Sequence, residues 1–457
     1  MLFHTYVFAI FFAVTYAGYY LLKKTRFWVY WLLVASYVFY GWWNPLYLFL
    51  ILYSTSLDYF AVRMMMRTER RKIWLALSVV NNLLLLGFFK YGAFAAENLT
   101  GLFAALGVPI TVPAPGALLP VGISFYVFQS MSYTIDFYRG RLEPERNFFR
   151  YAAFVSLFPQ LVAGPIERAS NLLPQLRSER RVTWENVTDG LTLFVLGLFK
   201  KVALADFLAI YVNEVYGNPA GHDGLAMVMA TYAFAWQIYF DFSGYTDMAR
   251  GVARMMGINL MVNFNHPYLA TSLRDFWQRW HISLSTWFKD YVYIPLGGNR
   301  GGKFNTYRNM FLTMVISGLW HGAAWNFVLW GFVHAVGRLL TTELEKTEFY
   351  RKIPKIIKQI WIYHFVCVTW IFFRAESLAD SVLILKTIAR FGLTDPRVPL
   401  VAALFCAGVW AYQFVSESGL RRVFEYAPVR VATMVCLLLY ILFFVRSSGQ
   451  QFIYFQF

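Results

Sequence analysis

The stretch MFLTMVISGLWHGAAWNFVL, Met310 to Leu329, contains no aspartate, glutamate, lysine or arginine. A helix needs about 20 predominantly apolar residues to cross a bilayer, so this stretch is long enough to do so. Other predominantly apolar runs recur along the chain at Leu2 to Leu22, Trp74 to Phe89, Leu191 to Phe207, Leu225 to Phe240, Ile360 to Phe373 and Val431 to Val445. By this length criterion we predict an all-α polytopic membrane protein with roughly ten to twelve transmembrane or re-entrant helices.

The composition agrees with a chain that lies mostly in lipid. Of the 457 residues, 58% are hydrophobic and 14% are charged, whereas a soluble domain carries about 25% charged residues. The net charge of +16 comes from short basic loops such as Lys23 to Arg26 and Arg139 to Arg150, which is typical of cytoplasmic loops. We therefore expect no nucleic acid partner, and a single membrane domain over residues 1–457.

One apolar segment does not fit simple alternation across the membrane. Tyr151 to Pro165 separates two basic loops, and a crossing there would place the second loop, Arg177 to Arg181, outside. The motif FPQLVAGPIER, Phe158 to Arg168, brings two prolines and a glycine into the segment. We predict a re-entrant or interfacial segment whose irregular backbone is buried in protein.

His321 is the most informative polar residue because it lies within the apolar stretch quoted above. An ionisable side chain inside a membrane is costly, so its presence suggests a function. Ser317 and Gly318 would let a ligand or another backbone come close, and Trp320 would give a rigid wall. An imidazole can take and return a proton near neutral pH. A histidine that only packs against a neighbouring helix is the alternative.

The sequence gives no indication of a metal site. His334 follows His321 by 13 residues, which is about 20 Å along an uninterrupted helix. The two histidines could therefore share a metal only if the helix breaks. The three cysteines, Cys367, Cys406 and Cys436, lie in apolar runs without metal-ligand spacing.

A second informative region is SLRDFWQRWHISLSTWFKDY, Ser272 to Tyr291. Its aromatic and leucine residues recur at helical spacing, which predicts an interfacial helix. His281 adjoins the aromatic face, where it either touches substrate or packs at the headgroup level. Arg279 in this helix and Arg300 in the turn that follows are candidate substrate-binding residues.

Two further motifs are polar. In PLGGNRGGK, Pro295 to Lys303, backbone N–H groups and cations together could hold an anion, although a plain cytoplasmic turn explains the motif equally well. In YFDFSGYTDMARG, Tyr239 to Gly251, the carboxylates of Asp241 and Asp247, with Arg250, could form a buried pair or orient a histidine. A helix-end cap is the simpler interpretation of that motif.

Taken together, the motifs of this chain resemble the membrane-bound O-acyltransferase family, and within it the bacterial alginate O-acetyltransferase membrane subunits and their peptidoglycan-acetylating relatives. The residues that carry the resemblance span nearly the whole chain: LPVGISFYVFQSMSYTIDFYRG (Leu119 to Gly140), FPQLVAGPIER, YFDFSGYTDMA, FWQRWHISLSTWFKDYVYIPLGGNRGG (Phe276 to Gly302), GLWHGAAWNFVLWG (Gly318 to Gly331), WIFFRAES (Trp370 to Ser377) and the terminal FIYFQF.

The resemblance implies helices around a central funnel or channel in the bacterial inner membrane. It implies that His321 is the catalytic residue and that His281 is a second candidate. Acetyl-CoA would be the cytoplasmic donor, a polysaccharide the acceptor and an extracytoplasmic SGNH-type protein the partner. Teichoic acid D-alanyl transferases share the histidines but not the PLGGNRGG turn, so D-alanyl transfer is the alternative activity within the family.

Our hypothesis for the reaction makes His321 the general base toward an acceptor hydroxyl that attacks the acetyl thioester. Ser317, Asn326 or backbone amides would stabilise the oxyanion, and no activated serine or cysteine is required. A transporter or channel is the rival class, but it predicts inverted repeats, and we find none. A structural scaffold for polysaccharide export is a third class, and it would tolerate the replacement of His321.

Overall fold

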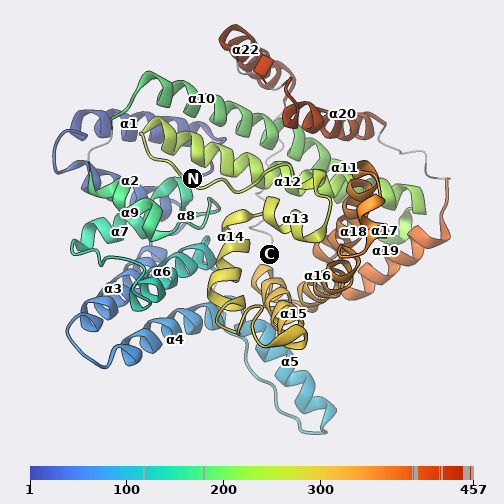
Figure 1. Ribbon diagram of the computed structural model, residues 1–457, viewed down its shortest axis with the longest axis horizontal. Helices are drawn as coiled ribbons and strands as arrows, with labels where there is room; N and C mark the ends of the chain where they lie inside the picture. The colour runs from blue at the N-terminus through green and yellow to red at the C-terminus, as the bar shows by residue number, and fades with distance from the viewer. Residues whose placement is uncertain are drawn as a thin grey trace. The chain divides into compact units, whose positions relative to one another are not determined.

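The computed structural model describes residues 1–116, 119–178, 181–393, 395, 400–420, 422–423, 426–445 and 453. Within these residues the chain is helical and contains no β-strand (Figure 1), which confirms the predicted all-α class. The terminal motif FIYFQF lies outside the described residues except for Ile453.

The helices vary widely in length. In chain order they are α1 (Tyr6–Leu22), α2 (Trp28–Gly41), α3 (Tyr47–Met65), α4 (Arg71–Phe89), α5 (Gly92–Ala105), α6 (Ile123–Tyr138), α7 (Phe148–Ser156), α8 (Phe158–Leu161), α9 (Ala169–Arg177), α10 (Trp184–Phe199), η1 (Lys200–Ala205), α11 (Asp206–Gly217), η2 (Pro219–Gly221), α12 (Gly224–Met255), η3 (Pro267–Leu269), α13 (Leu273–Arg279), α14 (Ile282–Phe288), η4 (Lys289–Tyr293), α15 (Gly302–His321), α16 (Trp325–Leu344), α17 (Glu348–Lys352), α18 (Lys355–Arg374), α19 (Leu378–Arg390), α20 (Leu400–Glu417) and α22 (Ala427–Phe444).

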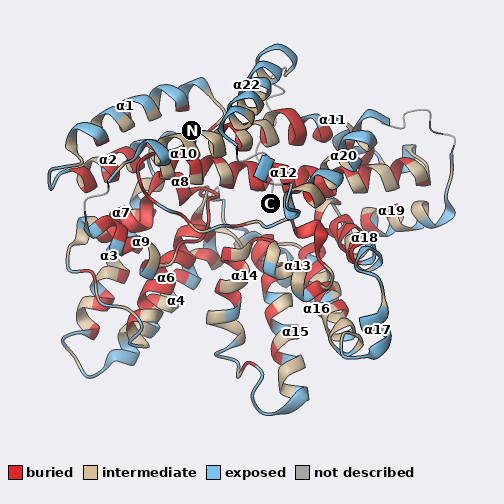
Figure 2. Ribbon diagram, turned by 45° about the horizontal axis from the view of Figure 1, so that its top comes forward, coloured by how far each residue is buried: buried red, intermediate tan, exposed pale blue. Residues whose placement is uncertain are grey.

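Four of the described helices, α3, α4, α18 and α22, are long and apolar enough to cross a membrane. Helices α1 and α2 are apolar but shorter. Helix α22 is apolar and contains no buried residue (Figure 2), as expected of a helix surrounded by lipid. Other predicted runs form helices that are shorter or more polar, so the total number of crossings stays a prediction.

The chain divides into two compact units. The first comprises Met1–Phe194 and Thr246–Met261, and the second comprises Val195–Tyr245 and Val262–Phe457. Two helices, α10 and α12, contain residues of both units. The single membrane domain that we expected over residues 1–457 stays a prediction.

In the first unit, the segment predicted to be irregular and buried has both properties. Helix α7 ends at Ser156, α8 covers only Phe158–Leu161, and the chain then runs without regular structure to Arg168. Every residue from Tyr151 to Glu167 is buried. The protein therefore shields the irregular backbone, as a segment at membrane depth requires, while its re-entrant path through the bilayer stays a prediction.

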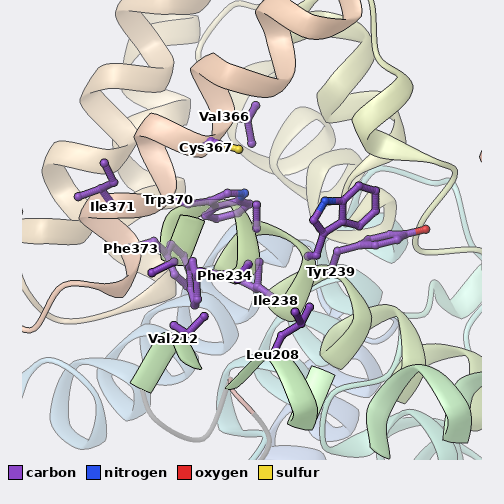
Figure 3. Close-up of a cluster of buried hydrophobic side chains, with 14 of the residues drawn as sticks. Leu208, Val212, Phe234, Ile238, Tyr239, Val366, Cys367, Trp370, Ile371 and Phe373 are labelled. Atoms are coloured by element: carbon purple, nitrogen blue, oxygen red, sulfur yellow. The ribbon is translucent and has the colours of Figure 1, made fainter. Parts of the chain in front are cut away.

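The second unit contains an aromatic-rich core, to which α11, α12 and α18 contribute (Figure 3). Phe234 and Ile238 of α12 and Trp370 of α18 are among its fully buried members. The ring centroids of Phe234 and Trp370 are 6.5 Å apart in an edge-to-face arrangement, a geometry that aromatic pairs prefer. This core fixes the position of α18 beside the helices that carry the candidate site.

The apolar stretch Met310 to Leu329 is not one helix, contrary to our expectation of a single spanning run. Helix α15 ends at His321 and α16 begins at Trp325, and the two helices pack against each other as a hairpin (Figure 1). Glycine permits the crossing, because a Cβ on Gly318 would lie 2.2 Å from the carbonyl oxygen of Phe327. The close approach expected at small residues is therefore found here.

The predicted interfacial helix Ser272 to Tyr291 is also broken. Helix α13 ends at Arg279, and α14 begins at Ile282. His281 lies between them with φ 43°, in the left-handed region, where a continuous helix cannot form. Ser272 caps α13 by accepting a hydrogen bond from the Asp275 N–H, which confirms the expected start of the helix.

Candidate active site

A cavity of about 920 Å³ lies in the second unit, between α13, α14, η4, α15, α16 and the glycine-rich turn. Four cationic side chains line it, those of Arg274, Lys289, Arg300 and Arg338, and none of the described residues that line it is acidic. Arg338 also donates to Thr342 at 2.7 Å and lies 3.4 Å from Glu345 outside the lining. Such a concentration of one sign of charge attracts an anionic ligand.

The glycine-rich turn forms part of the cavity wall, as its predicted role in holding an anion requires. Gly297, Gly298, Asn299 and Arg300 all line the cavity. The turn is held in place by Asn309 of α15, whose side-chain N–H donates to the carbonyl oxygen of Gly298 at 3.0 Å. Its position relative to the start of α15 is therefore fixed.

His321 lies one helical turn beyond the cavity. Ser317 lines the cavity, and His321 follows it by four residues on the same helix, an advance of about 6 Å. His321 is 4% exposed, and its ring centroid is 5.0 Å from that of Trp330 and 5.3 Å from that of Phe373. The imidazole is thus enclosed by aromatic rings at the end of α15.

His281 is buried on the other side of Trp320. Its Nδ1 accepts a hydrogen bond from the Leu284 N–H at 3.4 Å, so the side chain caps α14. Its ring centroid is 4.7 Å from that of Phe242 and 6.1 Å from that of Trp320, while Trp320 is 5.1 Å from His321. The fold therefore brings His281, Trp320 and His321 together, as expected if they share a site.

Two other predicted substrate-binding residues make contacts within the fold. Arg279 forms ion pairs with Asp275 at 2.7 Å and Glu417 at 2.6 Å, and it does not line the cavity. Asn326 donates to the carbonyl oxygen of Ala375 at 2.8 Å and so ties the start of α16 to the residue that follows α18. Their roles toward substrate stay predictions.

Asp241 takes part in a buried ion pair, one of the roles considered for it, and its partner is Lys201. The Lys201 Nζ lies 2.9 Å from Asp241 and 2.8 Å from Asp206, and the side chain of Lys201 is 4% exposed. Asp241 also accepts a hydrogen bond from the Ile453 N–H at 2.6 Å. Arg250 pairs instead with Asp247, at 3.3 Å.

Sequence reasoning missed Lys201 and three of the cations that line the cavity, Arg274, Lys289 and Arg338. Lys201 could have been found, because two adjacent lysines within the apolar run Leu191 to Phe207 are unusual in a membrane protein. The two arginines gave no comparable signal. They lie 64 positions apart in sequence, and only the packing of α13 near α16 places both on one cavity.

Comparison with known proteins places these motifs in context. The family model described as MBOAT, membrane-bound O-acyltransferase family, matches residues 123–378. The chain is 41% identical over 438 residues to a probable alginate O-acetylase of Azotobacter vinelandii, covering 92% of this chain and 85% of that protein. It is 36% identical to a peptidoglycan O-acetyltransferase of Helicobacter pylori, covering 84% and 79% of the two chains. A teichoic acid D-alanyltransferase of Bacillus subtilis is 29% identical, covering 64% and 78%.

Proposed function

Because the chain belongs to the membrane-bound O-acyltransferase family, we propose that it transfers acetyl groups from cytoplasmic acetyl-CoA toward an extracytoplasmic polysaccharide of the alginate or peptidoglycan type. The family makes the chain a multi-pass membrane acyltransferase. The cationic cavity is the observation that supports acetyl-CoA as the donor. This cavity extends to Ser317, which lies one helical turn from His321.

The cavity has the charge and size that a coenzyme A thioester requires. The nucleotide end of coenzyme A carries several phosphate charges, which Arg274, Lys289, Arg300 and Arg338 would neutralise. Its volume of about 920 Å³ is at the upper end of the range for small-molecule sites. The cations of the cavity, Arg300 of the glycine-rich turn among them, support a cytoplasmic entrance, and we place the protein in the bacterial inner membrane.

In the proposed reaction, His321 removes the proton from an acceptor hydroxyl. The hydroxyl oxygen forms a bond to the thioester carbonyl carbon, the carbon–sulfur bond breaks, and the thiolate of coenzyme A leaves with the proton that His321 had taken up, which restores the neutral imidazole. The hydroxyl of Ser317, which lines the cavity, would donate to the developing oxyanion. The aromatic rings around His321 exclude water, which strengthens these interactions.

We further propose that a separate extracytoplasmic protein of the SGNH type completes the transfer to the polysaccharide. The sequence contains no G-x-S-x-G elbow that would supply a serine nucleophile in this chain. The alginate and peptidoglycan O-acetylating relatives support a polysaccharide acceptor.

The proposal is tested by measuring release of coenzyme A from acetyl-CoA by the purified protein in nanodiscs. His321→Ala should lower the rate by about 10²- to 10⁴-fold, because a positioned general base contributes that much. His364→Ala is the matched control, since His364 is an exposed histidine of α18 whose Nδ1 lies 2.7 Å from the Ile360 carbonyl oxygen. A fully active His321→Ala protein would rule out His321 as the base, and release from a D-alanyl carrier in place of acetyl-CoA would favour the alternative activity.

A further inference from the structure

Three aromatic rings behind the wall of the cavity form a compact cluster, which we call the ring box: Trp277 of α13 and Trp330 and His334 of α16. The ring centroids of Trp277 and His334 are 5.1 Å apart, those of Trp330 and His334 4.7 Å, and those of Trp277 and Trp330 5.7 Å. Trp330 and His334 are fully buried, and Trp277 lines the cavity.

The polar atoms of the ring box have no hydrogen-bond partner among the described residues. These atoms are the indole Nε1 of Trp277, the indole Nε1 of Trp330 and both ring nitrogens of His334. A buried polar group without a partner destabilises a fold, and such groups are rare in native proteins. Four of them in one cluster require an explanation, and a polar ligand group that enters the cluster would satisfy them.

The ring box lies between the cationic part of the cavity and His321. On one side, Arg338 follows His334 by one turn of α16 and lines the cavity. On the other side, the ring of Trp330 is 5.0 Å from that of His321. A donor with its phosphates at the arginines and its thioester at His321 would therefore pass the ring box with its middle section.

In a coenzyme A thioester that middle section is the pantetheine arm, which carries two amide groups and a hydroxyl. We propose that the ring box, whose inner rings Trp330 and His334 are closed off from the cavity in this structure, opens to bind this arm, an inference that rests on the proposed donor. The two indole N–H groups donate to amide carbonyl oxygens, and the imidazole of His334 accepts from an amide N–H or donates to a carbonyl.

Trp277 controls access to this site. Of the three rings only Trp277 lines the cavity, so its indole separates Trp330 and His334 from the open space. The arm reaches the inner rings when the Trp277 side chain changes rotamer, and the indole N–H then turns toward the ligand. Since one side chain moves and no helix does, the arm can enter without disturbing the α15–α16 hairpin.

The test compares wild type with His334→Phe, a change that keeps an aromatic ring and removes both nitrogens. The KM for acetyl-CoA should rise about 3- to 10-fold, the effect of one lost hydrogen bond, with kcat unchanged because the contact is made equally in the bound and transition states. Inhibition by adenosine 3′,5′-bisphosphate, which lacks the arm, should not change. The melting temperature should stay equal or rise, since an apolar ring replaces polar groups that have no partner in the fold.

His364→Phe is the control and should leave every one of these values at the wild-type level. Trp277→Phe is a second variant, on the cavity wall, and it should raise the KM in the same way if His334→Phe does not fold. An unchanged KM in a folded His334→Phe or Trp277→Phe protein would overturn the ring box alone. Failure of wild type to bind coenzyme A or the bisphosphate would overturn the proposed donor, and the ring box with it.

Discussion

Asp58 in the first unit and Asp241 in the second are both buried carboxylates, but their partners differ in kind. Asp58 accepts hydrogen bonds from Ser78 at 2.6 Å, from Asn82 at 2.9 and 3.0 Å, and from Ser130. These three donors are neutral, and no ion pair involving Asp58 is found among the described residues. Asp241 is instead paired with the ammonium group of Lys201.

The difference shows two ways to keep a polar side chain in an apolar interior. Neutral donors on α4 and α6 converge on Asp58 of α3 and tie three helices together. In the second unit one cation serves two carboxylates and joins η1, α11 and α12. Loss of one neutral donor leaves the others in place, whereas loss of Lys201 removes the ammonium group that both carboxylates share. The second arrangement should be the more sensitive to mutation.

Replacement of Lys201 by methionine should give the largest stability change, a loss of about 3 to 5 kcal/mol. Removing one partner of a buried ion pair is strongly destabilising, and here two carboxylates would lose the ammonium group that they share. Thermal unfolding of the protein in detergent measures the effect. Adding Asp241→Asn to the variant should recover part of the loss, and a Lys201→Met protein as stable as wild type would contradict the comparison.

Asn82→Ala should have an intermediate effect, a loss of about 2 kcal/mol, because hydrogen bonds to a charged group contribute about 1.5 to 3 kcal/mol. Ser78 and Ser130 would still donate to Asp58. The same unfolding assay applies, and Asn81→Ala is the neighbouring control. A loss as large as that of Lys201→Met would show that the neutral network is no more tolerant than the ion pair.

Replacement of Glu145, in the loop before α7, should give the smallest change in stability. Although burial opposes ionisation, hydrogen bonds from the Asn147 N–H and Arg177 and the charge of Arg150 hold the pKa of Glu145 below its usual value. A lowered pKa stabilises the fold above the unfolded value of about 4.3, and this contribution is lost as the pH falls through the folded pKa. Glu145→Gln should lose about 1 kcal/mol at pH 7, and its stability should fall less than that of wild type between pH 5 and 3. If the stabilities of the two proteins fell in parallel with pH, the predicted contribution of Glu145 would be contradicted.

The sequence predicted well what depends on neighbouring residues. Most of the apolar runs predicted helices, α13 begins directly after Ser272 as expected, and the prolines and glycine of Phe158 to Arg168 indicated a broken segment. His321 was singled out because an ionisable residue within an apolar run can be recognised from the neighbouring sequence alone. The structure places it near the cavity, and its catalytic role awaits the test described above.

Features that depend on distant residues could not be predicted. Lys201 and Asp241 are 40 positions apart in sequence, and their pairing follows from the packing of η1 beside α12. The break after His321 also escaped prediction, because the residues around it are apolar on both sides. The break is explained by the packing of Phe327, because a Cβ on Gly322 would lie 2.1 Å from the ring of Phe327.

The three-residue link between α15 and α16 limits how His321 can move. Gly322, Ala323 and Ala324 are too few to form a loop that swings independently, and the two helices touch at Gly318 and Gly331. A slip of one residue along α15 would turn His321 by about 100° and shift it by about 1.5 Å, so the hairpin has one workable register. The hairpin therefore holds His321 in one position. In the reaction that we propose, the donor and the acceptor move to His321, and the moving parts are the surrounding side chains and the substrates.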